Sequence, residues 1–119
     1  MDNSVNKSKQ KGTGWETDLV DYLFLKGFAN VERRALAGIN DKGDIAGLNN
    51  VVIEAKNQNQ ITLAAWVAEA NKERENASAK IGVVWAKRKG KSSPGSGYVI
   101  MDGEQFVDIL HMLYSKKIL

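Results

Sequence analysis

Short apolar runs alternate with amphipathic helical segments along this chain, and their order limits the folds that it can adopt. Apolar residues recur at helical spacing after Thr13, after Thr62 and after Met101. Between these segments, strand-length runs occur at residues 31–35, 44–47, 51–56, 81–85 and 98–101. The order α-β-β-β-α-β-β-α predicts an α/β sandwich in which helices flank a mixed five-stranded sheet.

The chain of 119 residues suits a single domain. Residues 1–12 are polar and show no periodicity, so we expect a flexible basic arm there. The ordered domain is expected at residues 13–119, because Thr13 and Glu16 have the spacing of a helix capping box. In that interpretation Glu16 satisfies a backbone N–H of the first helix.

The composition excludes several kinds of site. The chain has no cysteine, which excludes disulfides, zinc–thiolate sites and cysteine nucleophiles. Its one histidine, His111, cannot form a site that needs several imidazoles. No apolar run is long enough to cross a membrane, and the polar start lacks the apolar core of a signal peptide. The sequence therefore predicts a cytoplasmic protein without membrane contact.

The net charge of +3 is distributed unevenly. The first twelve residues and the loop after the fourth expected strand hold seven basic residues and one acidic residue, whereas the rest of the chain holds ten and thirteen. The basic residues of these two segments are Lys7, Lys9, Lys11, Lys87, Arg88, Lys89 and Lys91. A basic periphery around an acidic body indicates a polyanionic partner such as DNA, although the loop is also compatible with an ordinary solvated turn.

Two charged residues interrupt the apolar run at residues 51–56. Strand alternation places Glu54 and Lys56 on one face, where apolar side chains would normally lie. Asp44 lies ten residues before Glu54, on the other strand of an expected hairpin. A three-residue loop or a bulge would put Asp44 on the same face, whereas a two-residue turn at Asn49-Asn50 would put it on the opposite face.

Paired carboxylates on one face predict a metal-dependent hydrolase. Neighbouring carboxylates raise each other's pKa unless a cation lies between them. Oxygen ligands favour Mg²⁺, Mn²⁺ or Ca²⁺, and such an ion activates water and stabilises a phosphodiester transition state. Lys56 would orient that water or neutralise the phosphate. The spacing alone also fits a solvent-facing strand with alternating Glu and Lys, so both interpretations stay open at this point.

A family resemblance adds to this interpretation. Gly43-Asp44-Ile45 followed by Val52-Ile53-Glu54-Ala55-Lys56 resembles the P-D…(D/E)-x-K motif of the restriction-endonuclease-like nuclease superfamily, with Gly43 in place of proline. The preceding segment has Gly-x-Glu at the start of a helix, then Gly-Phe and an arginine, and is similar to Holliday junction resolvases of archaea and phages. The resemblance implies a single restriction-endonuclease-like domain.

The same resemblance implies roles for individual residues. Asp44 and Glu54 would bind Mg²⁺ or Mn²⁺, and Ala55 would contribute its backbone carbonyl. Lys56 would be the catalytic lysine, and Glu16 would match the acidic residue on the first helix of the family. The implied activity is Mg²⁺-dependent hydrolysis of DNA phosphodiester bonds at four-way junctions by a homodimer, because resolving a junction takes two cuts.

Two other functions stay open: a nuclease of this superfamily with a different DNA substrate, of the nicking or restriction type, and a non-catalytic DNA-binding module in which the charged residues are a structural ion-pair cluster. In all three, Arg33 or Arg34 would hold a phosphate on the acidic side. Glu69 and Glu73 are expected to be an exposed pair, one helical turn apart. Exposed apolar residues of the last helix, such as Met112 or Leu119, are candidates for a dimer surface.

Overall fold

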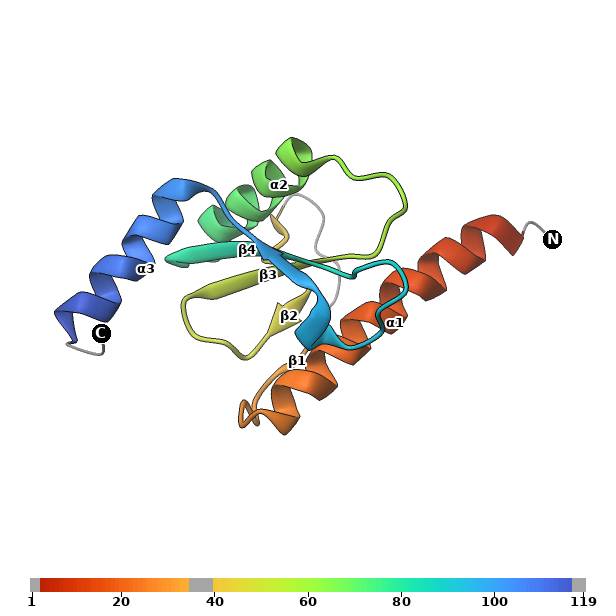
Figure 1. Ribbon diagram of the computed structural model, residues 1–119, viewed down its shortest axis with the longest axis horizontal. Helices are drawn as coiled ribbons and strands as arrows, with labels where there is room; N and C mark the ends of the chain where they lie inside the picture. Colours follow the sequence, from red (N-terminus) through yellow and green to blue (C-terminus); the bar gives the residue numbers. More distant parts are fainter. Residues whose placement is uncertain (1–2, 35–39, 117–119) are drawn as a thin grey trace.

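The computed structural model describes residues 3–34 and 40–116, without the side chains of residues 3–13. Helices and strands follow one another in the predicted order (Figure 1). In this part of the chain the helices are α1 (Asn3–Leu25), α2 (Leu63–Asn76) and α3 (Gly103–Ser115), and a short 3₁₀ turn occupies Pro94–Ser96. The strands are β1 (Glu32–Arg33), β2 (Ile45–Ala46), β3 (Val51–Lys56), β4 (Ile81–Ala86) and β5 (Tyr98–Ile100).

In the described part of the chain the strands form two sheets, so the predicted mixed sheet is present but its five-stranded form is not confirmed. Strand β4 lies in the centre of a mixed sheet, parallel to β3 and antiparallel to β5. Strands β1 and β2 form a separate antiparallel pair in which Glu32 faces Ala46. Next to β2, Asp44 contacts β3 through the hydrogen bond from its backbone N–H to Ile53 O and through its carboxylate, which accepts from Ala55 N. The predicted end of the first strand, Ala35, lies outside the described residues.

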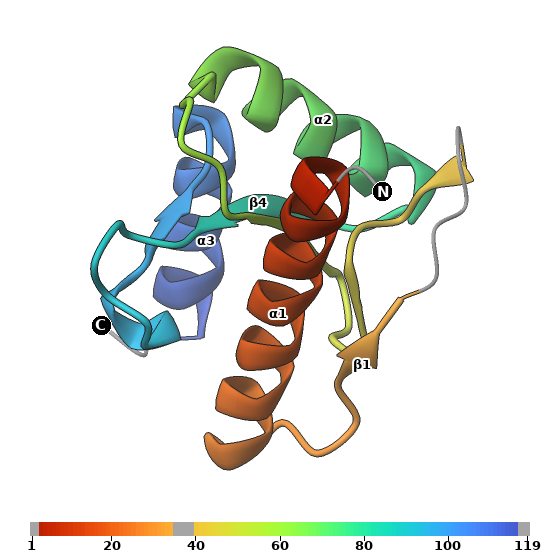
Figure 2. The ribbon, with the colours of Figure 1, turned by 90° about the vertical axis from the view of Figure 1, so that its right-hand side faces the viewer.

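Helices α1 and α2 lie on opposite faces of the β3–β4 pair (Figures 1 and 2). Trp15 and Leu19 of α1 pack with Ile53 and Val83 in the larger buried cluster. On the other face, Trp66 and Ala70 of α2 pack against Val84. This arrangement explains why β3 and β4 are the most apolar runs in the sequence, since sheet residues buried on both faces need apolar side chains on both.

Helix α1 begins at Asn3, so the capping box predicted at Thr13 is wrong. Thr13 lies in the helix interior, and residues 3–12 are also helical. The first part of α1 extends away from the sheets (Figure 1). Trp15, where the apolar periodicity of the sequence begins, is buried in the larger cluster. Residues 1 and 2 lie outside the described residues.

Asp102 joins α3 to the rest of the fold. As the N-cap of α3 it accepts a hydrogen bond from the backbone N–H of Gln105 at 2.9 Å. Its other carboxylate oxygen accepts one from Asn71 Nδ2 of α2, also at 2.9 Å. Gln105 is buried and accepts from Gly82 N of β4 at 2.6 Å. One carboxylate therefore connects α3 with α2 and, through Gln105, with β4.

No helix in the described part of the chain has the length and apolar character that a bilayer crossing requires.

We predict that Asp102→Ala lowers the free energy of unfolding by about 1–2 kcal/mol at neutral pH, because it removes an N-cap and a buried network loses an acceptor. The backbone hydrogen bond from Gln105, followed by the side-chain bonds from Asn71 and Gln105, lowers the pKa of Asp102 below 3.8. The stability that the Asp102 carboxylate contributes is therefore present above its unfolded-state pKa and is lost as the pH falls through its folded-state pKa.

Urea unfolding of the wild type and Asp102→Ala at pH 7 and pH 3 measures this difference. The difference in free energy of unfolding between the wild type and Asp102→Ala should be smaller at pH 3 than at pH 7. Asp108→Ala, an exposed position on the same helix, is the control and should change stability by less than about 0.5 kcal/mol. An equal gap at both pH values would contradict the role given to the carboxylate.

Candidate metal centre

Glu54 and Lys56 lie on the face of β3 that is turned toward α2. Glu54 is opposite Val84 in the parallel register, and Val84 packs against α2. The intervening residue, Ile53, packs with the α1 cluster on the other face. Glu54 is 5% exposed, and its Oε1 lies 3.9 Å from Lys56 Nζ. A carboxylate and an ammonium thus occupy a buried sheet face where apolar side chains are normal.

Asp44 reaches this strand without forming the predicted hairpin ladder. Its backbone N–H donates to Ile53 O at 2.9 Å, and its carboxylate oxygen Oδ2 accepts from Ala55 N at 2.8 Å. The carboxylate takes the place of a backbone acceptor along the edge of β3. Neither of the two loop registers considered from the sequence describes this geometry. Asp44 is therefore buried and held beside Glu54. Its Oδ2 accepts from Ala55 N, and its Oδ1 does not take part in that hydrogen bond.

Gly43 has a φ of +97°, and a Cβ atom there would meet Val52 Cγ1 at 2.7 Å. Proline cannot adopt this conformation because its ring fixes φ near −65°. The glycine that replaces the motif's proline is therefore required by the local backbone of this chain.

Two further carboxyl groups, from Asp41 and Glu73, lie beside Glu54. One carboxylate oxygen from each of the three residues lies within 4.8 Å of the other two, so the group could hold a metal ion. Asn76 Nδ2, at the end of α2, donates to Asp41 O at 2.8 Å and holds the loop against the helix. We call Asp41, Glu54 and Glu73 the acidic triad.

Glu73 was expected to be exposed, and that prediction is wrong: it is 3% exposed. It lies seven residues after Trp66 and three after Ala70, which is the spacing of the buried face of α2. That spacing was a signal in the sequence that could have identified it. Glu69, one turn earlier, is exposed as predicted and pairs with Lys56.

The acidic triad has buried oxygens without partners. In the described part of the chain, Glu54 Oε2 and Glu73 Oε2 are buried and accept no hydrogen bond. Burial, followed by the neighbouring Glu73 and Asp44 carboxyl groups, raises the pKa of Glu54 well above 4.5. Burial also raises the pKa of Glu73, to about 7. Carboxyl groups packed in this way must hold protons or a cation, and all-oxygen ligands favour Mg²⁺, Mn²⁺ or Ca²⁺.

Lys56 is a cation at this site. Its Nζ lies 2.8 Å from Glu69 Oε2, closer than to Glu54. Burial alone would lower the pKa of Lys56, but the hydrogen bond that Lys56 donates to Glu69 and the charge of Glu54 outweigh burial and raise the pKa. Lys56 is therefore protonated at neutral pH, which suits neutralisation of an anion rather than proton abstraction.

Glu16 approaches the acidic residues from α1. Arg33 Nε donates to its Oε2 at 3.2 Å. Burial, followed by the charge of Asp44, raises the pKa of Glu16 despite the opposing effect of Arg33. Arg33 thus lies on the acidic side, as expected for one member of the arginine pair. Arg34 is half-buried, and its Nε has no hydrogen-bond partner among the described residues.

The remaining basic residues lie in two places. The side chains of Lys7, Lys9 and Lys11 are outside the described part, although their backbone belongs to α1. Within residues 87–97, Lys89 and Lys91 are exposed. The end of this loop is anchored, because Pro94 is buried and its carbonyl accepts from Trp85 Nε1 at 3.1 Å.

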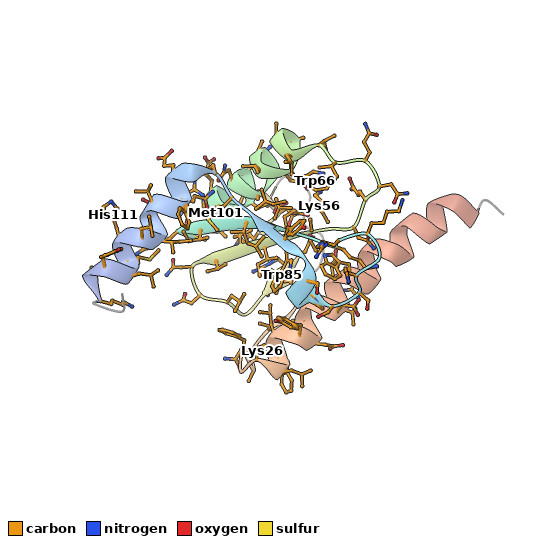
Figure 3. The ribbon with its side chains drawn as sticks, in the orientation of Figure 1. Lys26, Lys56, Trp66, Trp85, Met101 and His111 are labelled. Carbon is orange, nitrogen blue, oxygen red and sulfur yellow. The ribbon has the colours of Figure 1, made fainter. Side chains whose placement is uncertain are left out.

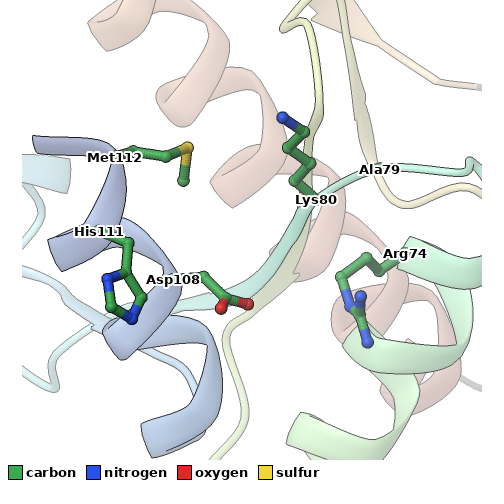
Figure 4. Close-up of a pocket in the computed structure, with 6 residues that line it drawn as sticks. All are labelled: Arg74, Ala79, Lys80, Asp108, His111 and Met112. Atoms are coloured by element: carbon green, nitrogen blue, oxygen red, sulfur yellow. The ribbon is translucent and has the colours of Figure 1, made fainter. Parts of the chain in front are cut away.

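Other singled-out residues lie away from the acidic triad. His111 is exposed on α3, distant from Lys56 (Figure 3). It borders a surface cavity of about 470 Å³ together with Arg74, Lys80 and Asp108 (Figure 4). Met112 is half-buried against the main cluster rather than exposed, which corrects its assignment to a dimer surface, and Leu119 lies outside the described residues.

No family model, curated protein or solved structure matches this chain.

We predict that Glu73→Gln changes both metal binding and stability. Because burial raises the pKa of Glu73, its stabilising protonated form is present below about 4.5 and is lost as the pH rises through about 7. The metal-free wild type should therefore lose stability over that range, and Glu73→Gln should lose less. The variant should also bind Mn²⁺ at least about tenfold more weakly.

Thermal unfolding between pH 4.5 and pH 7.5, with and without Mn²⁺, checks both effects. Glu75→Gln is the matched control, because Glu75 is exposed on the same helix. If Glu73→Gln and Glu75→Gln gave the same increase in Tm with Mn²⁺, Glu73 would not be a ligand.

Proposed function

We propose that this protein is a metal-dependent endonuclease that hydrolyses DNA phosphodiester bonds, with four-way junctions as its substrate. The observation that carries the proposal is the protonated Lys56 next to the buried carboxyl group of Glu54, with Asp44 held beside both by the backbone of β3. Carboxylates for a divalent cation and an ammonium for the scissile phosphate are what phosphodiester hydrolysis requires of its site.

The carboxyl groups and Lys56 would have different roles in the proposed reaction. Glu54 would hold Mg²⁺ or Mn²⁺ together with Asp44 and with Glu73 or Asp41, and the Ala55 carbonyl is a further candidate ligand. Such an ion, when bound, supplies an activated water and Lewis-acid stabilisation of the phosphate. Lys56 Nζ would neutralise the charge that develops on the phosphate oxygens. Its ion pair with Glu69, at 2.8 Å, orients it toward that position.

Glu16 and Arg33 form the second half of the proposed site. Glu16 lies in the field of Asp44, so it would bind the same cation or orient a water bound to it. The guanidinium of Arg33 is 44% exposed and would exchange Glu16 for a DNA phosphate when the cation neutralises the carboxylates. Glu16 would thus have the role that the first-helix resemblance implies. The capping alternative is removed, because Thr13 lies inside α1.

The proposed fold family is the restriction-endonuclease-like sandwich. Its support is the order of elements, the E-x-K residues on the central parallel pair, and an acidic residue on α1 that faces the same site. Lys7, Lys9 and Lys11 on the projecting part of α1 and the exposed Lys89 and Lys91 would bind the DNA backbone. A homodimer would supply the second cut, and the exposed Phe106, Val107 and Tyr114 of α3 are better candidates for its surface than Met112.

We predict that the purified protein cleaves a synthetic four-way junction in Mg²⁺ but not in Ca²⁺ or EDTA. Asp44→Asn and Lys56→Ala should each reduce the single-turnover rate by about 100-fold or more. Lys72→Ala, exposed on α2, is the control for a lost surface charge and should keep the rate within about threefold.

The same assay separates the alternatives. Equal cleavage of junction and linear duplex would favour a nuclease with another DNA substrate and contradict junction selectivity. DNA binding that never leads to cleavage and is insensitive to Glu54→Ala would favour a binding module and contradict the proposed chemistry.

Glu16→Gln provides a further test of the site. We expect cleavage to fall by about tenfold or more, because a charge is removed beside Asp44. The free energy of unfolding should change by less than about 1 kcal/mol, because Glu16 lies inside α1 and does not cap it. Chemical denaturation alongside the cleavage assay measures both, and cleavage at the wild-type rate would exclude a catalytic role.

A further inference from the structure

A second cavity has Lys56 among its lining residues. It has a volume of about 330 Å³ and lies between α2, β4, β5 and the segment before α2. Its walls are mainly apolar and include Trp66, Tyr98 and Ile100, with the polar Lys56 and Lys87 beside them. Lys56 and Trp66 lie close together in Figure 3. The volume and the apolar lining are those of a site for a small flat molecule.

The charges around this cavity select an anionic ligand. Lys56, which is paired with Glu69, and Lys87 line it, and none of the lining residues in the described part of the chain is acidic. The guanidinium of Arg88 lies 5.1 Å from the centroid of the Tyr98 ring and adds a third cation beside the wall. A divalent cation would be repelled here, whereas an aromatic molecule attached to a phosphate would find an apolar wall and neighbouring cations.

The apolar wall is also accessible. Tyr98 is 59% exposed and Ile61 is 66% exposed, although both line the cavity. A base stacked on the Tyr98 ring would cover this surface, and base–aromatic stacking tolerates any base.

We propose that this cavity receives an unpaired nucleobase of the DNA strand whose phosphate lies at Lys56. The inference rests on the proposed function and names the feature that the enzyme recognises. One residue, Lys56, borders both the cavity and the acidic site, since its Nζ lies 3.9 Å from Glu54 Oε1. The base and the phosphate of one nucleotide are only a short distance apart, so one nucleotide can place its phosphate at Lys56 and its base in the cavity. A bulged base is already unpaired, and a base at a branch point has interrupted stacking, so either leaves the helix at a lower free-energy cost than a base within an intact duplex.

Binding to three fluorescein-labelled DNAs tests the inference in Ca²⁺, where cleavage is not expected. The first is a continuous duplex, the second contains one unpaired adenosine, and the third has an abasic site in place of that adenosine. The wild type should bind the second about tenfold more tightly than the third. Tyr98→Ala should abolish this preference, and Tyr98→Phe should retain it because the ring remains.

Phe24→Ala is the matched control, because Phe24 is an aromatic residue that is 58% exposed on α1 and does not line the cavity. It should leave the preference for adenosine unchanged. Equal binding of the adenosine and abasic DNAs, no binding of any of the three, or a preference that survives in Tyr98→Ala would each overturn the inference. A change of oligomeric state in Tyr98→Ala without a change in base preference would also overturn it, because the cavity would then be a protein interface.

Cleavage in Mg²⁺ is measured separately with the same DNAs. Cleavage without any base preference contradicts the inference and leaves the proposed function standing. A Tyr98-dependent base preference without cleavage supports base binding and contradicts the nuclease.

Discussion

The buried carboxyl group of Glu54 imposes the main constraint on this structure. Strand pairing holds it opposite Val84, with the carboxyl groups of Asp44 and Glu73 around it. Removal from water and mutual repulsion both disfavour the charged forms, so the metal-free group must retain protons. Two nearby basic residues offset part of this negative charge. Lys56 pairs with Glu54 and Glu69, and Arg33 pairs with Glu16. Stability, metal affinity and the proposed chemistry therefore depend on one set of charges.

The parts of this site that obey local periodicity were predictable from the sequence. Strand β3 has the predicted bounds because it opens with three β-branched residues, Val51, Val52 and Ile53, and all six of its residues pair in a single parallel register with β4. Alternation along that strand was enough to put Glu54 and Lys56 on one face. The positive φ of Asn50, +63°, likewise agrees with the turn predicted at Asn49-Asn50.

The remaining features depend on tertiary contacts that no local pattern contains. Asp44 contacts β3 through one backbone hydrogen bond and through its side chain, a combination that neither hairpin register describes. Glu73 was assigned by its charge, although its spacing from Trp66 placed it on the buried face of α2. Asp41 joins the acidic triad only because the end of α2 holds its loop. The early start of α1 was not predicted, because residues 1–12 are polar and show no apolar periodicity.

Calorimetric titration of the protein with Mg²⁺ at pH 7, in two buffers of different ionisation enthalpy, tests the central claim most directly. If Glu54 and its neighbours hold protons until a cation replaces them, binding should saturate at the acidic site and release about one proton per ion bound. Glu54→Gln should abolish that binding. Absence of saturable binding, or binding without proton release, would contradict the account of the acidic residues as a metal centre.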